Sequence, residues 1–303
     1  MDLREKPGKI QKFLELMLRF RLITLVVMVI AMVSFLATRW QEVVSLPLAS
    51  SEAFGMWLAE IESVPAAWDS AQYLAVAGLA CVVLFFVFGG IRSGVASILS
   101  SALLVAALYI MGGAESMPGP MFGIFAAVAL VLLLFAKLSI ACGLFPFALS
   151  WLFLSGLLAV LPENVGPKWL LWAVLSVFAF ASSMAFSLTA GKHLGAGMPQ
   201  AGALVKASKQ MMVPVLVGAL LLIAAVAFDM PQVVEGETAQ AEPVSVWSHV
   251  PGALLLWGVF AAWFFVFLAP VSSFAPWERL RSGSRRVEMK DKKKTSAKSK
   301  KSK

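Results

Sequence analysis

Charged side chains are scarce in this chain of 303 residues: Asp, Glu, Lys and Arg together account for 14% of it, and hydrophobic residues for 60%. In soluble domains about a quarter of the residues are charged. The few charges cannot coat a soluble globule of this size, whereas a lipid environment requires no polar coat. The composition therefore excludes an ordinary soluble domain and predicts an integral membrane protein.

Cysteine and histidine are almost absent, with two residues of each. Cys81 and Cys142 both lie in the middle of apolar runs, and neither has neighbours at metal-ligand spacing. His193 and His249 are far apart in sequence and lack carboxylate or thiolate partners for a metal site. The H-E-x-x-H, G-x-S-x-G and P-loop patterns are also missing. We predict no catalytic residue, no metal, no cofactor and no enzymatic activity.

Asp, Glu, Lys and Arg are missing from the interior of each long apolar stretch. A charge placed there would cost roughly 2.5–3.5 kcal/mol or more, so a proton- or sodium-driven transporter with a buried carboxylate is disfavoured. Each stretch can hold the roughly 17–25 residues that a membrane-spanning helix needs. We predict an all-α, polytopic membrane helix bundle with about eight transmembrane helices, near residues 22–38, 72–88, 94–111, 120–136, 139–161, 169–190, 211–228 and 251–274.

The basic residues are sorted to one side of these spans. All of the 25 Lys and Arg residues except Arg39 and Lys168 fall in the N-terminal arm, in alternate loops or in the C-terminal tail. Positive charge stays inside during insertion, so both termini are expected on the cytoplasmic side of a bacterial-type inner membrane. The organisation is then a basic arm over residues 1–21, a transmembrane bundle over 22–277, and a Lys-rich tail over 278–303 that cannot bury a core and is expected to be disordered.

Three segments are expected to form helices outside the spans. Residues Lys6 to Arg21 either lie on the cytoplasmic membrane face or extend the first span, because apolar side chains recur there at helical spacing: Ile10, Phe13, Leu14, Met17 and Leu18. A second helix, from Ser51 to Pro65, is expected to rest on the outer leaflet or on the bundle. A third, from Pro199 to Gln210, is expected to lie in the membrane plane before the seventh span.

Two sets of residues are candidates for contacts. Ser93, Ser97 and Ser101 recur every four residues and predict a helix-packing face, in preference to a substrate contact. The tail lysines either serve topology and solubility or contact anionic lipid headgroups or a partner protein. No aromatic residue is interleaved among them, so binding to nucleic acid or a ribosome is not favoured. The candidate lysines are Lys290, Lys292, Lys293, Lys294, Lys298, Lys300, Lys301 and Lys303.

The stretch from Phe186 to Phe228 contains Ala203-Leu204, Ala207 and Pro214-Val215-Leu216. It resembles the membrane segment of RND/MMPL-type exporters, where a basic loop and a short in-plane helix lead into a proline-containing span. The hairpin from Leu84 to Gly113, with its central Arg92, is similar to two consecutive spans of that family. The large extracytoplasmic domains and the proton-coupling carboxylates of the family have no counterpart here. The resemblance therefore implies a reduced relative, and no functional residue is carried over.

Two functions fit these features. The favoured hypothesis is a non-catalytic subunit or scaffold of a membrane complex, concerned with export or secretion. The alternative is a small RND-like permease for an uncharged or lipidic substrate. A scaffold predicts a filled core and a surface that matches other membrane-protein subunits. A permease predicts a polar cavity at mid-membrane depth, lined by serines from this set: Ser97, Ser101, Ser150, Ser155 and Ser183.

Overall fold

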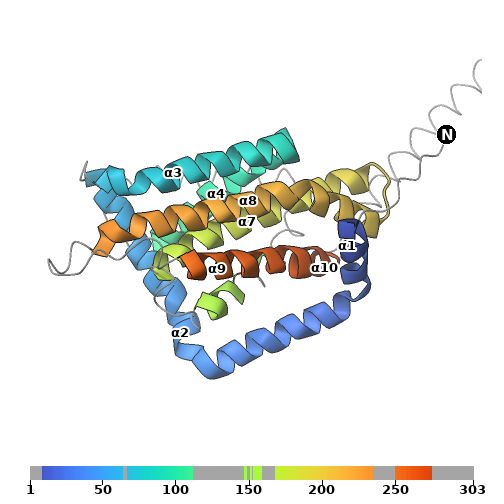
Figure 1. Ribbon diagram of the computed structural model, residues 1–303, viewed down its shortest axis with the longest axis horizontal. Coiled ribbons are helices and arrows are strands. Elements are labelled where there is room, and N and C mark those ends of the chain that lie inside the picture. Colours follow the sequence, from blue (N-terminus) through green and yellow to red (C-terminus); the bar gives the residue numbers. More distant parts are fainter. Residues whose placement is uncertain are drawn as a thin grey trace, which may run out of the picture.

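The computed structural model describes residues 9–63, 67–111, 147–148, 151, 153–158, 168–234 and 250–274. Every element within these ranges is helical, and no strand occurs among them (Figure 1). The elements are α1 (Lys9–Arg19), α2 (Arg21–Ser63), α3 (Ala67–Leu84), the π-helical turn η1 (Phe85–Gly89), α4 (Ile91–Met111), α7 (Lys168–Gly195), α8 (Gln200–Val234), α9 (Val250–Ala262), the π-helical η4 (Trp263–Leu268) and α10 (Ala269–Ser272).

Within the described ranges, four helices are long and apolar enough to cross a membrane, over Gln72–Gly89, Ile91–Leu108, Lys168–Gly195 and Gln200–Ala227. Two shorter apolar helices cover Arg21–Ala31 and Val250–Ala262. The expected all-α architecture is confirmed, and these helices fit a membrane location. The expected span at 120–136, most of that at 139–161, and the Lys-rich tail lie outside the described residues, so the count of eight stays a prediction.

Helix α7 forms the centre of the bundle. In its membrane-spanning window 89% of residues are buried, against 22% for the window in α3. Trp172, Ala185 and Phe186 are completely inaccessible. A helix that is apolar on all sides, with charges only at its ends, is expected to be enclosed by other helices. Helices α2, α4 and α8 all pack against it.

Helix α2 is bent where its backbone leaves helical geometry at Arg39 (φ −137°, ψ 36°). Its first half stands apart from the other long helices, and its second half turns toward them (Figure 1). The helix expected from Ser51 is therefore the continuation of α2, and Ser51 is a buried residue within it, not its first turn. Of the two positions considered, this segment takes the one on the bundle, where Phe54 joins the hydrophobic core.

Helix α8 is continuous from Gln200 to Val234, so the separate in-plane helix expected before residue 211 does not form. The turn after α7 contains Gly197 at φ +85°, a backbone conformation that L side chains rarely adopt. Pro199 then precedes the first turn of α8, where its carbonyl accepts a hydrogen bond from Ala203 N at 2.9 Å. Pro199 thus lies directly before α8 and does not begin a separate helix.

Helix α1 is a separate short helix set at an angle to α2 (Figure 1). Leu14 is 1% exposed, and α1 packs against α8 and α10 at one end of the bundle. The arm therefore does not extend the first expected span as a straight helix.

Candidate functional site: an apolar cavity between α3 and α4

Helices α3 and α4 form a hairpin whose arms pack on different partners. α3 packs chiefly against α8, and α4 packs chiefly against α7. On the α3 side, the Cys81 thiol donates to the Gly218 carbonyl at 3.5 Å. On the α4 side, the Ser93 and Thr189 hydroxyls lie 2.9 Å apart in a buried hydrogen bond. The two arms are thus held by separate helices beyond their shared turn.

The turn of this hairpin is tight. Gly90 adopts φ +81°, and its carbonyl accepts hydrogen bonds from Ser93 N and Gly94 N at 3.0 Å each. Gly94 lies directly against the ring of Phe86, where a Cβ would overlap the ring atoms. The arms therefore touch near the turn and diverge away from it.

A cavity of about 490 Å³ fills the space between the diverging arms. Phe54 and Trp57 of α2 close the end remote from the turn, and Leu222 of α8 lies in the wall. The remaining lining residues come from α3, α4 and α7: Leu74, Ala75, Gly78, Cys81, Val82, Phe85, Ser97, Ile98, Ser101, Val105, Val174, Val177, Phe178 and Ala181. Among the described residues that line the cavity none is charged, and the hydroxyl groups among them belong to Ser97 and Ser101.

The cavity reaches the surface of the bundle between α3 and α4. Its lining residues Ala75 and Ile98 are exposed, Ile98 by 43%. The outer face of α3 beside this opening carries Val76, Leu79 and Val83, which are all more than half exposed. Because these side chains are apolar, the opening faces the part of the molecule that suits hydrocarbon, not water.

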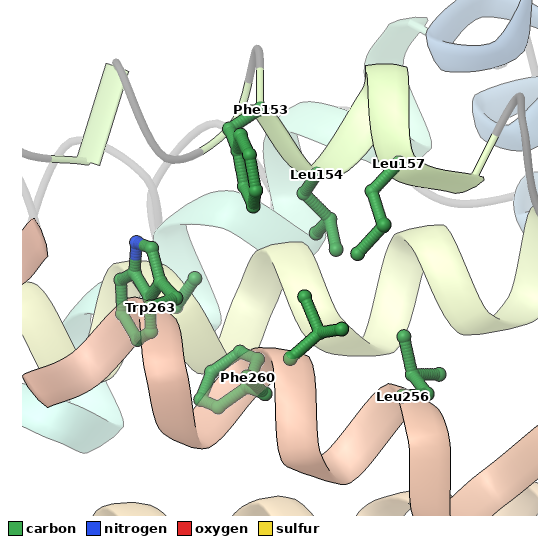
Figure 2. Close-up of a pocket in the computed structure, with 8 residues that line it drawn as sticks. Phe153, Leu154, Leu157, Leu256, Phe260 and Trp263 are labelled. Atoms are coloured by element: carbon green, nitrogen blue, oxygen red, sulfur yellow. The ribbon is translucent and has the colours of Figure 1, made fainter. Parts of the chain in front are cut away.

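A second apolar interface shows what filled packing looks like in the same molecule. Figure 2 shows Phe153, Leu154 and Leu157 on one side and Leu256, Phe260 and Trp263 of α9 and η4 on the other, with their side chains directed toward one another. The space left between them is about 20 Å³, close to the roughly 10–15 Å³ that a single water molecule requires. The cavity between α3 and α4 is therefore not a general looseness of the bundle.

The three serines of the predicted helix-packing face, Ser93, Ser97 and Ser101, have different surroundings. Ser93 and Ser97 are each 1% exposed, and the Ser97 hydroxyl donates to the Gly94 carbonyl at 2.8 Å. Ser101 is half-buried and lines the cavity beside Ser97. Among the described lining residues the wall is apolar apart from these two hydroxyls, so the polar lining expected for a permease is not found there.

Ser155 and Ser183, two other serines considered for a permease, are not among the described residues that line this cavity. The Ser155 hydroxyl accepts a hydrogen bond from Trp172 Nε1 at 2.9 Å and so fixes the core. Ser183 is buried on α7, and its hydroxyl has no hydrogen-bond partner among the described residues. The same holds for Ser176, Ser182 and Ser187. Ser150 lies outside the described residues. The cavity itself could not be found from the sequence, because it results from the divergence of α3 and α4.

Polar contacts join four segments at the end of the bundle where the α3–α4 turn lies. The Gln210 amide donates to the Phe88 carbonyl at 2.6 Å, and its oxygen lies 3.3 Å from His193 Nε2. Lys209 Nζ donates to Gln11 Oε1 of α1 at 2.8 Å. We call this the basic end, since it contains Lys9, Lys12, Arg19, Arg21, Arg92, Lys192, Lys206 and Lys209.

The opposite end of the bundle contains few described basic residues. Trp57 and Trp169 meet there edge to face, with ring centroids 6.4 Å apart, which joins the second half of α2 to the start of α7. The charged residues at that end whose side chains the structure describes are Arg39, Glu52 and Lys168. Most of the described basic residues thus lie at one end of the bundle.

Among the described residues, no group of three His, Cys, Asp or Glu side chains is placed to hold a metal ion. The candidate lysines of the tail lie outside those residues. Comparison of the chain with protein-family models, with curated proteins and with solved structures finds no match. The resemblance to RND/MMPL-type exporters therefore stays a prediction, and the functional argument depends on the cavity.

Proposed function

We propose that this chain is a non-enzymatic multi-pass protein of a bacterial inner membrane that binds an uncharged or lipidic molecule in the cavity between α3 and α4, as a small permease does. The proposal includes about eight spans with both termini cytoplasmic, as the spacing of apolar stretches and the positive-inside rule predict. The observation that carries it is the cavity of about 490 Å³.

The size of the cavity supports a ligand. Small-molecule sites are typically cavities of about 300–1,000 Å³ with mostly apolar walls and a few polar groups. Among the described lining residues the polar groups are the Ser97 and Ser101 hydroxyls, and no charged side chain occurs. A charged solute would lose its hydration without gaining a counter-charge, which costs at least several kcal/mol. The lining thus selects apolar molecules that carry at most a hydroxyl, ester or ether group.

The position of the opening supports a route from the bilayer. The gap between α3 and α4 is flanked by exposed apolar side chains such as Leu79, which is 67% exposed. A molecule dissolved in the membrane can reach the cavity sideways without crossing a polar surface. A water-soluble substrate would have no comparable path along this face.

Gly78 offers a direct test, because it lines the cavity and a Cβ added there meets no atom within 4 Å. Gly78→Leu therefore adds an apolar side chain to the cavity lining, and its Cβ meets no neighbouring atom. Gly258→Leu is the matched control, since Gly258 on α9 also has open space around it but lies outside the cavity lining.

The wild type and the two variants would each be purified separately. The apolar molecules bound to each protein would then be extracted and quantified by mass spectrometry. We expect Gly78→Leu to retain at most about one tenth of the wild-type amount, which corresponds to about 1.4 kcal/mol of lost binding, and Gly258→Leu to retain all of it. Equal retention by both variants, or a wild type without any bound apolar molecule, would count against the proposal.

The role of a subunit or scaffold in a membrane complex, concerned with export or secretion, is the second candidate. It is favoured by the first half of α2, whose apolar side chains are exposed along one face: Leu22, Ile23, Val26, Val27, Ile30 and Val33. A transmembrane helix of another subunit could pack there in place of lipid. Crosslinking in membranes followed by affinity purification tests this role, and recovery of the chain alone as a monomer would contradict it.

A further inference from the structure

Helix α1 has three faces with different surroundings. Leu14 is buried and Leu18 is packed against the core, so this face is fixed to the bundle. A second face carries the apolar side chains of Ile10, Phe13 and Leu16, which are more than 40% exposed, as is Phe20 in the turn that follows α1. A third face carries the exposed basic residues Lys12 and Arg19. A helix that exposes an apolar face beside a basic one is suited to lie at a membrane surface.

The exposed apolar face of α1 continues into α2. Leu22, Ile23 and Val26, immediately after α1, are 65%, 59% and 55% exposed. Figure 1 shows α1 at the corner where α2 departs from the end of the bundle. Because the α2 face suits hydrocarbon, α1 lies at the depth where hydrocarbon gives way to headgroups.

The charge at this depth is strongly positive. Besides Lys9, Lys12 and Arg19 of α1, the neighbouring turns expose Arg92, Lys192 and Lys206. The acidic residue in the described segments of this end is Glu15, which accepts a hydrogen bond from Gln11 at 2.9 Å. Basic residues close to a bilayer attract anionic headgroups, and their contributions accumulate with each residue.

We propose that α1 and the basic end form a binding surface for anionic phospholipid headgroups, with Ile10, Phe13 and Phe20 inserted among the acyl chains. The surface is preformed, because Leu14 is buried and Lys209 Nζ is bonded to Gln11 Oε1 at 2.8 Å. Lipid binding therefore does not have to supply the free energy of folding α1. This proposal is independent of the cavity and of its ligand.

The test uses the full-length protein in detergent micelles, titrated separately with phosphatidylglycerol and with phosphatidylcholine, and the bound lipids are counted by native mass spectrometry. The variant combines Lys9→Gln, Lys12→Gln and Arg19→Gln. The matched control combines Arg39→Gln and Lys168→Gln, which remove positive charge from the opposite end. We expect the preference for phosphatidylglycerol to fall at least about tenfold in the variant and to stay unchanged in the control.

Two further variants separate the contributions. Phe13→Ser is expected to weaken binding of both lipids equally, because it removes insertion and leaves the charge. Removal of Lys290 to Lys303 is expected to leave most of the preference in place. The proposal is overturned if the α1 variant behaves like its control, if tail removal alone abolishes the preference, or if inorganic phosphate displaces the lipid, which would indicate a site for a small anion.

Discussion

Gly218 lies where α8 crosses α3 and α7 at short distance. A Cβ at this position would be 2.7 Å from Phe178 Cζ, 2.9 Å from Phe178 Cε2 and 3.1 Å from Cys81 Sγ. Contacts this short are not tolerated, so Gly218→Ala must displace the Phe178 ring or the backbone of α8. The ring is confined, since Phe85 and Phe260 lie 6.0 Å and 5.6 Å away between centroids. The space that remains for it is the cavity, which Phe178 lines.

The expected loss of free energy of unfolding follows from comparing Gly218→Ala with a matched control, Gly258→Ala. Overpacking of this kind costs about 1–3 kcal/mol, whereas Gly to Ala within a helix gains up to about 1 kcal/mol. Gly258→Ala has the same helical gain without the clash, because a Cβ there meets no atom within 4 Å. We therefore expect the free energy of unfolding of Gly218→Ala to lie about 1–3 kcal/mol below that of Gly258→Ala.

Both variants would be unfolded in the same detergent by titration with SDS, with tryptophan fluorescence as the signal. A second measurement is the amount of bound apolar molecule, which should fall in Gly218→Ala as the Phe178 ring enters the cavity. Equal free energies of unfolding for the two variants would refute the reasoning, since the added Cβ is expected to clash at Gly218 and to meet open space at Gly258.

Three further predictions concern single contacts and the tail. Ser155→Ala leaves the buried Trp172 Nε1 donor without its acceptor at 2.9 Å and should lower the free energy of unfolding by about 1–3 kcal/mol, measured by SDS titration; no change would show that the indole finds another partner. A double-mutant cycle of Ser93→Ala and Thr189→Val should give a coupling energy of about 0.6–1.7 kcal/mol for their 2.9 Å hydrogen bond; a value near zero would contradict a direct contact. Removal of Lys290 to Lys303 should leave membrane insertion intact and weaken association with anionic liposomes or a partner at low salt, measured by flotation; unchanged flotation would exclude an electrostatic role for the tail.

The helical class and four of the spans were predictable because charge is absent from long stretches. The expected spans near 72–88, 94–111, 169–190 and 211–228 overlap helices long and apolar enough to cross a membrane. Hydropathy could not predict which helix is central. The windows in α4 and α7 have the same mean hydropathy of 1.8, yet 39% of the first and 89% of the second is buried. Lipid and protein interior are equally apolar, so the sequence contains little contrast between a face toward lipid and a face toward the core.

The sequence pattern also did not predict that α8 is continuous from Gln200 to Val234. The apolar and basic residues between Ala201 and Lys209 alternate as in a surface helix, but no Gly or Pro separates them from the following apolar run. Pro214 lies within α8 and does not end it. The cavity was also beyond prediction, because it depends on α3 packing against α8 while α4 packs against α7, and neither pairing is encoded in a local pattern.

The unequal lengths of the helices have a mechanical consequence. Helix α4 has 21 residues and spans about 32 Å at 1.5 Å per residue, close to the roughly 30 Å hydrocarbon core of a bilayer. Helix α8 has 35 residues and spans about 52 Å, so it must tilt or project well into the aqueous phase. A thinner or thicker membrane would thus displace the α3–α4 hairpin relative to the longer helices α7 and α8. The strain of such a mismatch would fall between α4 and α7, which places the cavity wall under the control of bilayer thickness.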